Sequence, residues 1–173
     1  MKKYTIALLI LIYNSTMNAQ SIFEASRNGD LNEITILFNA NNDIINAVDD
    51  KGFTPLILAA YSNQLEVVNF LIQHGCALNA KDFSGNTALM GVCFKGYLDI
   101  AKTLIDNGTS VNEQNANDAT ALIYASTFGH TEIVNYLLQN NADKTIKDNR
   151  GNTALAHAEM QGNKEIMELL VIE

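Results

Sequence analysis

One offset of 33 residues aligns most of this 173-residue chain with itself. Four sets of residues recur at this offset, and each set keeps one residue type or one kind of side chain: Thr54, Thr87, Thr120, Thr153; Leu56, Leu89, Leu122, Leu155; Val67, Ile100, Ile133, Ile166; Leu71, Leu104, Leu137, Leu170. A fixed period of this length is the signature of a repeat protein, in which each unit is one supersecondary element and neighbours bury each other's apolar faces. The period therefore predicts a stack of similar units.

Within each unit the spacing predicts two helices. Thr54 precedes Pro55, so its hydroxyl is placed to cap a first helix, whose first turn tolerates proline. Residues that accept the left-handed conformation recur after the first helix, after the second helix and in a later turn; they are Asn63, Gly96, Gly129, Gly162; Gly75, Gly108, Asn141; and Gly52, Gly85, Asp118, Gly151. Each unit is predicted to run helix, turn, helix, hairpin loop.

The residues TPLILAA at 54–60 and GHTEIVNYLL at 129–138 make the chain resemble the ankyrin-repeat family. This resemblance implies an all-α repeat solenoid of about five ankyrin repeats, each a helix-turn-helix with a β-hairpin loop, stacked in one curved domain. Residues 20–173 would form this domain, with repeats at approximately 21–48, 49–81, 82–114, 115–147 and 148–173. The helices of the first repeat align with the second at an offset of 34, which predicts one extra residue between Asn39 and Ile44.

The first 19 residues have the pattern of a signal peptide. Lys2 and Lys3 form a basic start, residues 5–13 (TIALLILIY) are apolar apart from Thr5, and a polar stretch follows. The apolar run is about half of the ~20 residues that a membrane-spanning helix needs. We therefore expect cleavage ahead of Gln20, export without membrane insertion, and a periplasmic or secreted protein. The alternative interpretation is an amphipathic or buried first helix.

The charge of the chain argues against two classes of partner. Lys plus Arg number 11 against 19 for Asp plus Glu, a formal net charge of -8. An acidic surface of this size repels nucleic-acid phosphates and anionic lipids, so we expect neither as a partner. Separately, we expect the protein to be a monomer.

The motifs of common enzyme classes are absent from the sequence, which predicts a protein that is not an enzyme and binds no cofactor or metal. No H-E-x-x-H or G-x-S-x-G is present, and His74, His130 and His157 fall in three different structural roles. The alternative of another class is a catalytic or metal-binding protein, with Asp49, Asp50 and Asp82 holding Ca²⁺. We favour a simpler interpretation, in which these carboxylates accept backbone amides in the turns.

Cys76 and Cys93 lie where neighbouring repeats carry small residues. The sequence allows two buried free thiols or, in an oxidising compartment, a disulfide between adjacent repeats.

In the fold that the chain resembles, side chains of the hairpin turns and of the first-helix ends point to the concave groove. The residues in these places form our candidate partner-binding set: Lys51, Phe53, Tyr61, Phe83, Asn86, Phe94, Lys95, Asn117, Phe128, Arg150, Asn152 and Met160. Aromatic rings rimmed by polar groups are typical of protein-binding surfaces. The alternative is that the rings lie on neighbouring repeats as outer core.

The favoured function is accordingly a non-enzymatic interaction module that holds a partner protein or peptide after export. Two narrower hypotheses remain open, namely an accessory or stabilising factor for an exported enzyme, and a secreted effector that acts on host or competitor proteins.

Overall fold

The computed structural model describes residues 22–171 of the chain, and the predicted signal peptide and its cleavage site lie outside this range. The chain divides into two compact units, Met1–Cys76 and Ala77–Glu173, which we describe separately. The described residues contain helices and turns and no strand, in agreement with the predicted helical repeat solenoid. No helix in this range is long and apolar enough to cross a membrane.

In the first unit, residues 22–28 are helical, and they are followed by α2 (Leu31–Ala40), the 3₁₀ helix η1 (Asn42–Asn46), α3 (Pro55–Tyr61) and α4 (Leu65–Gln73). The 3₁₀ helix lies where the sequence predicts one extra residue. Ile44 and Ile45 of η1 are buried, so the additional turn places two apolar side chains in the core of this unit.

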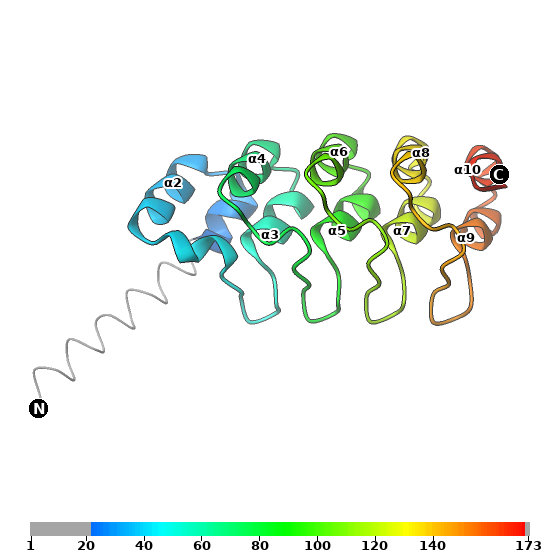
Figure 1. Cartoon of the computed structure of the whole chain (residues 1–173), viewed down its shortest axis with the longest axis horizontal. Helices are drawn as coiled ribbons and strands as arrows, with labels where there is room; N and C mark the ends of the chain where they lie inside the picture. Colours follow the sequence, from blue (N-terminus) through cyan, green and yellow to red (C-terminus); the bar gives the residue numbers. More distant parts are fainter. Residues whose placement is uncertain (1–21, 172–173) are drawn as a thin grey trace, which may run out of the picture. The chain divides into compact units, whose positions relative to one another are not determined.

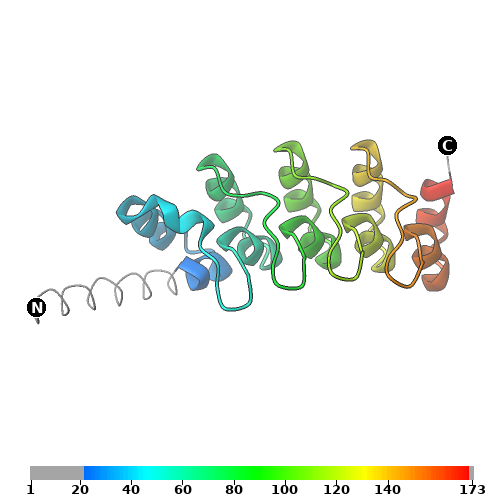
Figure 2. The same ribbon diagram turned by 60° about the horizontal axis from the view of Figure 1, so that its bottom comes forward.

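The second unit has three helix pairs arranged in two layers. The first helices are α5 (Ala88–Lys95), α7 (Ala121–Thr127) and α9 (Ala154–Gln161), and the second helices are α6 (Leu98–Asp106), α8 (Thr131–Gln139) and α10 (Lys164–Val171). Figures 1 and 2 show each layer as a row of neighbouring helices, with hairpin loops extending from the first-helix row. Leu89, Leu104, Leu122 and Leu137, all members of the recurring sets, are fully buried between the helices.

The predicted threonine caps are present in four repeats. The hydroxyl oxygens of Thr54, Thr87, Thr120 and Thr153 accept hydrogen bonds from the backbone N–H three residues later, at 3.2–3.3 Å. Each hydroxyl thereby satisfies one of the amides that a helix start leaves without a partner.

The predicted left-handed positions are also confirmed. Asn63, Asp118 and Asn141 adopt φ of 60°, 56° and 65°, and the glycines at equivalent positions of other repeats have positive φ as well. Asn and Asp tolerate this conformation better than other residues with a side chain.

The hairpin loops of the described residues contain no strand, unlike the β-hairpin loop that the resemblance implies. Each has one backbone bond between its two arms, such as Asn115 N–H to the Ala119 carbonyl at 3.1 Å, and one within the turn, such as Asp118 N–H to the Asn115 carbonyl at 2.9 Å. A single bond between the arms is too short a ladder to form a strand.

Candidate partner-binding surface

One polar side chain anchors every hairpin turn, and it recurs at the 33-residue offset as Asp49, Asp82, Asn115 and Asp148. Its Oδ1 accepts the backbone N–H groups two and four residues later, at 2.8–3.0 Å. These amides belong to residues that include six of the candidate set: Lys51, Phe53, Asn86, Asn117, Arg150 and Asn152. The turn anchor therefore fixes the backbone from which these side chains extend.

The anchors account for two of the three acidic residues that the Ca²⁺ hypothesis invoked. Asp49 and Asp82 each accept two backbone amides, as the simpler interpretation predicts. Within residues 22–171, no group of three or more His, Cys, Asp or Glu side chains is arranged to hold a metal ion.

Three aromatic side chains of the second unit meet where the third and fourth repeats adjoin, and we call Phe94, Tyr124 and Phe128 the aromatic surface. The Phe94 ring meets Phe128 edge to face, with centroids 4.5 Å apart, and meets Tyr124 in the same manner at 6.3 Å. Such arrangements stabilise aromatic pairs beyond their burial. Phe128 is nevertheless 47% exposed, so the cluster is open to solvent on one side.

A polar network holds one side of the aromatic surface. Asn115, which is buried, donates from Nδ2 to the Oδ1 of Asn86 at 2.7 Å and to the hydroxyl oxygen of Tyr124 at 2.9 Å. The same Asn115 accepts the two backbone amides of its own turn. A single side chain therefore couples the hairpin at 82–86, its own hairpin at 115–119 and α7.

Two basic side chains, Lys95 and His130, contact Phe94. The Lys95 ammonium is 6.0 Å from the centroid of the Phe94 ring, within the range of a cation–π interaction. The Nε2 of His130, at the start of α8, lies 3.3 Å from the Phe94 carbonyl oxygen. The His130 contact joins the end of α5 to the following repeat.

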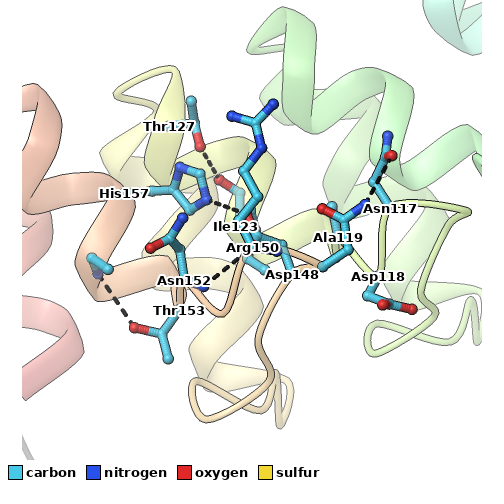
Figure 3. A network of polar contacts seen from close by, with 12 residues as sticks. Asn117, Asp118, Ala119, Ile123, Thr127, Asp148, Arg150, Asn152, Thr153 and His157 are labelled. Atoms are coloured by element: carbon cyan, nitrogen blue, oxygen red, sulfur yellow. Dashed lines mark hydrogen bonds and ion pairs between the residues drawn. The ribbon is translucent and has the colours of Figure 1, made fainter.

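A second group of polar residues lies where the fourth and fifth repeats adjoin, and we call Asn117, Asp148, Arg150 and His157 the polar surface (Figure 3). Asn149 N–H donates to the Asn117 carbonyl at 2.9 Å, and the His157 Nε2 lies 2.8 Å from Asp148 Oδ2. The Arg150 guanidinium extends away from its hairpin and is exposed.

The Asp148 carboxyl has a pKa below its ordinary value. Its burial acts to raise the pKa, but hydrogen bonds from Asn152 N–H, His157 and Arg150 N–H, with the charge of His157, favour the ionised form and outweigh that effect. The carboxylate is thus held ionised by the hairpin that it anchors.

Five other candidate residues are at least partly exposed. Phe83 is 77% exposed in the hairpin at 82–86, and Met160 is 60% exposed in α9. Lys51, Phe53 and Tyr61 belong to the first unit, with Tyr61 at the end of α3 and 44% exposed.

Sequence reasoning missed Tyr124 and Asn115 and gave His157 no partner. The signal that would have found them is a spacing of nine residues between a turn anchor and a polar first-helix residue. Tyr124 lies nine residues after Asn115, and His157 lies nine residues after Asp148, whereas earlier repeats have Leu58 and Gly91 at this position. The pairs were hidden because neither member resembles a known motif by itself.

Both cysteines are buried free thiols in the structure, which corresponds to the first of the two alternatives. Burial raises the pKa of the Cys76 thiol to about 11, and burial also raises the pKa of the Cys93 thiol. Neither thiol is therefore a nucleophile at neutral pH, because the thiolate is the reactive form.

Comparison with known proteins identifies the family. A model of ankyrin repeats matches in three copies, over residues 4–82, 22–115 and 89–173. The chain therefore belongs to the ankyrin-repeat family. Ankyrin repeats generally mediate protein–protein interaction and are typically not enzymes.

Individual relatives are similar over about 60 residues. The chain is 31% identical to the human DNA-binding protein RFXANK over 35% of this chain and 24% of that protein. It is 36% identical to human ankyrin repeat family A protein 2, over 34% of this chain and 18% of that protein. It is 37% identical to the BTB/POZ domain-containing protein 3 of Schizosaccharomyces pombe, over 36% of this chain and 12% of that protein. The chain thus spans less than a quarter of the length of these relatives.

Proposed function

We propose that this chain is a non-enzymatic binding module that acts after export and holds a partner protein or peptide on the hairpin and first-helix side of its repeats. The observation that carries the proposal is the aromatic surface. Phe94, Tyr124 and Phe128 come from two repeats and meet as an open cluster on the first-helix layer. Aromatic anchors with polar neighbours are typical of the residues that dominate binding energy at protein interfaces.

The polar network supports this proposal because it pre-orders the surface. Asn115 fixes the Tyr124 hydroxyl and the hairpin of Asn86 before any partner arrives. A surface whose side chains are already ordered loses less conformational entropy on binding.

Export is part of the proposal and rests on the sequence of residues 1–19 alone. A fusion of these residues to a reporter enzyme that is active only outside the cytoplasm tests it. We expect activity for the natural sequence, and loss of activity when an Asp residue replaces Leu9. Activity that is equal in both fusions contradicts export by this segment.

The binding role is tested by affinity capture with the full chain as bait, followed by reconstitution with the purified captured protein. The double variant Phe94→Ser with Phe128→Ser should lose the partner while it keeps the helical signal of the wild type. The matched control is Val171→Ser, which removes an apolar side chain that is 63% exposed in α10 of the other layer. Equal binding by the wild type and the double variant contradicts the proposal, and unfolding of the double variant assigns the rings to the outer core.

A narrower role of the partner interaction follows from this test. If the captured protein is an exported enzyme whose activity or thermal stability rises in the complex, the chain is an accessory factor. If the captured protein comes only from a host or competitor extract, the chain is an effector.

A further inference from the structure

We propose that the aromatic surface recognises an extended peptide segment of the partner in which a large apolar side chain and a carboxylate lie within two residues of each other. This inference rests on the proposed function and adds the chemistry of the partner. Three groups carry it: the open face of the aromatic rings, the Tyr124 hydroxyl and the Lys95 ammonium.

The aromatic rings supply the apolar contact. Phe94 packs against Phe128 and Tyr124 with its edges and faces, yet Phe128 remains 47% exposed. One large apolar side chain laid against Phe128 would remove this ring from water, and each buried aromatic or aliphatic group of this size stabilises a complex substantially.

The Tyr124 hydroxyl supplies a hydrogen-bond donor. Its oxygen accepts from Asn115 Nδ2 at 2.9 Å, and within residues 22–171 its own hydrogen has no acceptor. The side chain is half-buried, so its orientation is fixed by the Asn115 bond and by packing. A carbonyl oxygen of an extended backbone is a suitable acceptor for a fixed phenolic donor.

The charge of the surrounding helices sets the preference for a carboxylate. Along α5, α7 and the Phe128 position that follows, Lys95 is the one charged side chain. Its ammonium lies 6.0 Å from the Phe94 centroid, so a group that reaches Lys95 lies beside the aromatic surface.

The second helices have the opposite character. The helices α6 and α8 together contain three acidic residues, Asp99, Asp106 and Glu132, and one basic residue, Lys102. In the hairpin at 82–86, Asp82 accepts hydrogen bonds from two backbone amides. Lys81, which precedes this hairpin, pairs with Glu113 at 2.7 Å. Asp118 lies in the turn of the hairpin at 115–119, where its backbone N–H donates to the Asn115 carbonyl at 2.9 Å. An acidic chain thus presents a basic group beside its aromatic cluster, and this favours a carboxylate there.

The complementary partner is a peptide and not a nucleic acid. A phosphate backbone is bound through many cations, and its affinity rises with the number of phosphates neutralised. One lysine beside aromatic rings, in a chain of net charge -8, matches a single carboxylate better than a polyanion.

The experiment is a selection from a phage-displayed library of random 12-residue peptides on the immobilised full chain, followed by affinity measurements with the selected synthetic peptides. We expect the selected peptides to share a large apolar residue with Asp or Glu within two positions. Replacement of that acid by its amide, and the variant Lys95→Glu, should each weaken binding about tenfold. The variant Tyr124→Phe should weaken it by a smaller factor.

The controls separate the inference from the proposed function. Lys164→Glu makes the same charge change in α10, in the second-helix layer, and should leave affinity within about twofold of the wild type. If peptides are selected without any acid preference, or if Lys95→Glu binds them equally, the inference is wrong and the proposed function stands. If the double variant Phe94→Ser with Phe128→Ser binds the selected peptides as the wild type does, or if no peptide is enriched, both are contradicted.

Discussion

The aromatic surface and the polar surface are built on the same scaffold from different side chains. Each has a threonine cap, a turn anchor and a polar partner nine residues after the anchor. At the third and fourth repeats this pair is Asn115 and Tyr124, and at the fourth and fifth it is Asp148 and His157. At the helix ends, Phe94 of α5 is replaced by Thr127 of α7, whose hydroxyl donates to the Ile123 carbonyl of its own helix at 2.7 Å.

This difference separates the residues that the fold requires from those that it merely permits. Both surfaces keep two backbone amides on the turn anchor and a threonine cap on the helix that follows, so these features follow from the repeat. The aromatic rings are found at one of the two surfaces only. The fold is formed without them at the other, and their presence at the first is better explained by binding.

The largest effect is expected from the core that both surfaces share. Leu122 of α7 is 1% exposed, and α7 packs against both α5 and α9. Leu122→Ala should lower the free energy of unfolding by about 2–5 kcal/mol, because it leaves a cavity in a packed interior. Urea denaturation followed by circular dichroism measures this change. Met160→Ala at an exposed site is the control, and an equal midpoint for wild type and Leu122→Ala would contradict the packing.

The next effect concerns the anchor of the aromatic surface. Asn115→Ala removes two acceptor bonds to backbone amides and two donor bonds, at a buried site. We expect a loss of about 2–3 kcal/mol in unfolding free energy, since buried amides are left without partners. Asn115→Asp should cost less, because the carboxylate that other repeats carry here keeps the two backbone bonds. A loss in Asn115→Asp as large as that in Asn115→Ala would show that the two backbone bonds contribute little.

Gly85 and Gly151 occupy the same turn position in two hairpins, at 82–86 and at 148–152, and differ in what surrounds them. A Cβ on Gly85 would lie 2.8 Å from the Ala116 nitrogen, whereas a Cβ on Gly151 would meet nothing within 4 Å. Both residues have positive φ, 79° and 84°, so alanine is strained at each by about 1–2 kcal/mol.

Gly85→Ala should therefore destabilise the protein more than Gly151→Ala does, because the hairpins at 82–86 and 115–119 must also move apart. The relevant backbone contact is Ala116 N–H to the Ser84 carbonyl at 3.0 Å. Thermal unfolding of the two variants measures the difference. Equal melting temperatures would show that these hairpins are not in close contact.

The smallest effect is a pH dependence at the polar surface. The pKa of Asp148 is lowered in the folded chain, so its ionised form contributes stability above the ordinary carboxyl pKa of about 4. That contribution is lost as the pH falls through the folded-state pKa. Asp148→Asn should therefore differ from the wild type in unfolding free energy at pH 6 and approach it below about pH 4. A difference that is independent of pH would exclude this carboxylate as its source.

Much of the fold could be predicted because it depends on local chemistry that repeats. The caps at Thr54 and Thr87 and the left-handed turns at Asn63 and Gly75 each need only a residue type at one place. Three or four copies of each pattern make chance agreement improbable, and the structure has them all.

The site could be predicted only in part, because it depends on pairs of residues from different elements. Phe94 and Phe128 were selected by position, but their contact depends on how α5 and α7 pack. Tyr124 looked like an ordinary first-helix residue until its bond to Asn115 was seen. The 3₁₀ helix at Asn42–Asn46 was foreseen only as one extra residue, since the length of an insertion does not specify its conformation.

The most direct test of the account is hydrogen–deuterium exchange of the full chain with and without a bound partner or selected peptide. We predict that binding slows exchange at the end of α5, at the end of α7 and in the hairpins that Asn115 couples, while α6, α8 and α10 exchange as in the free protein. Protection confined to the second helices, with no change around Phe94 and Phe128, would contradict the assignment of the aromatic surface to partner binding.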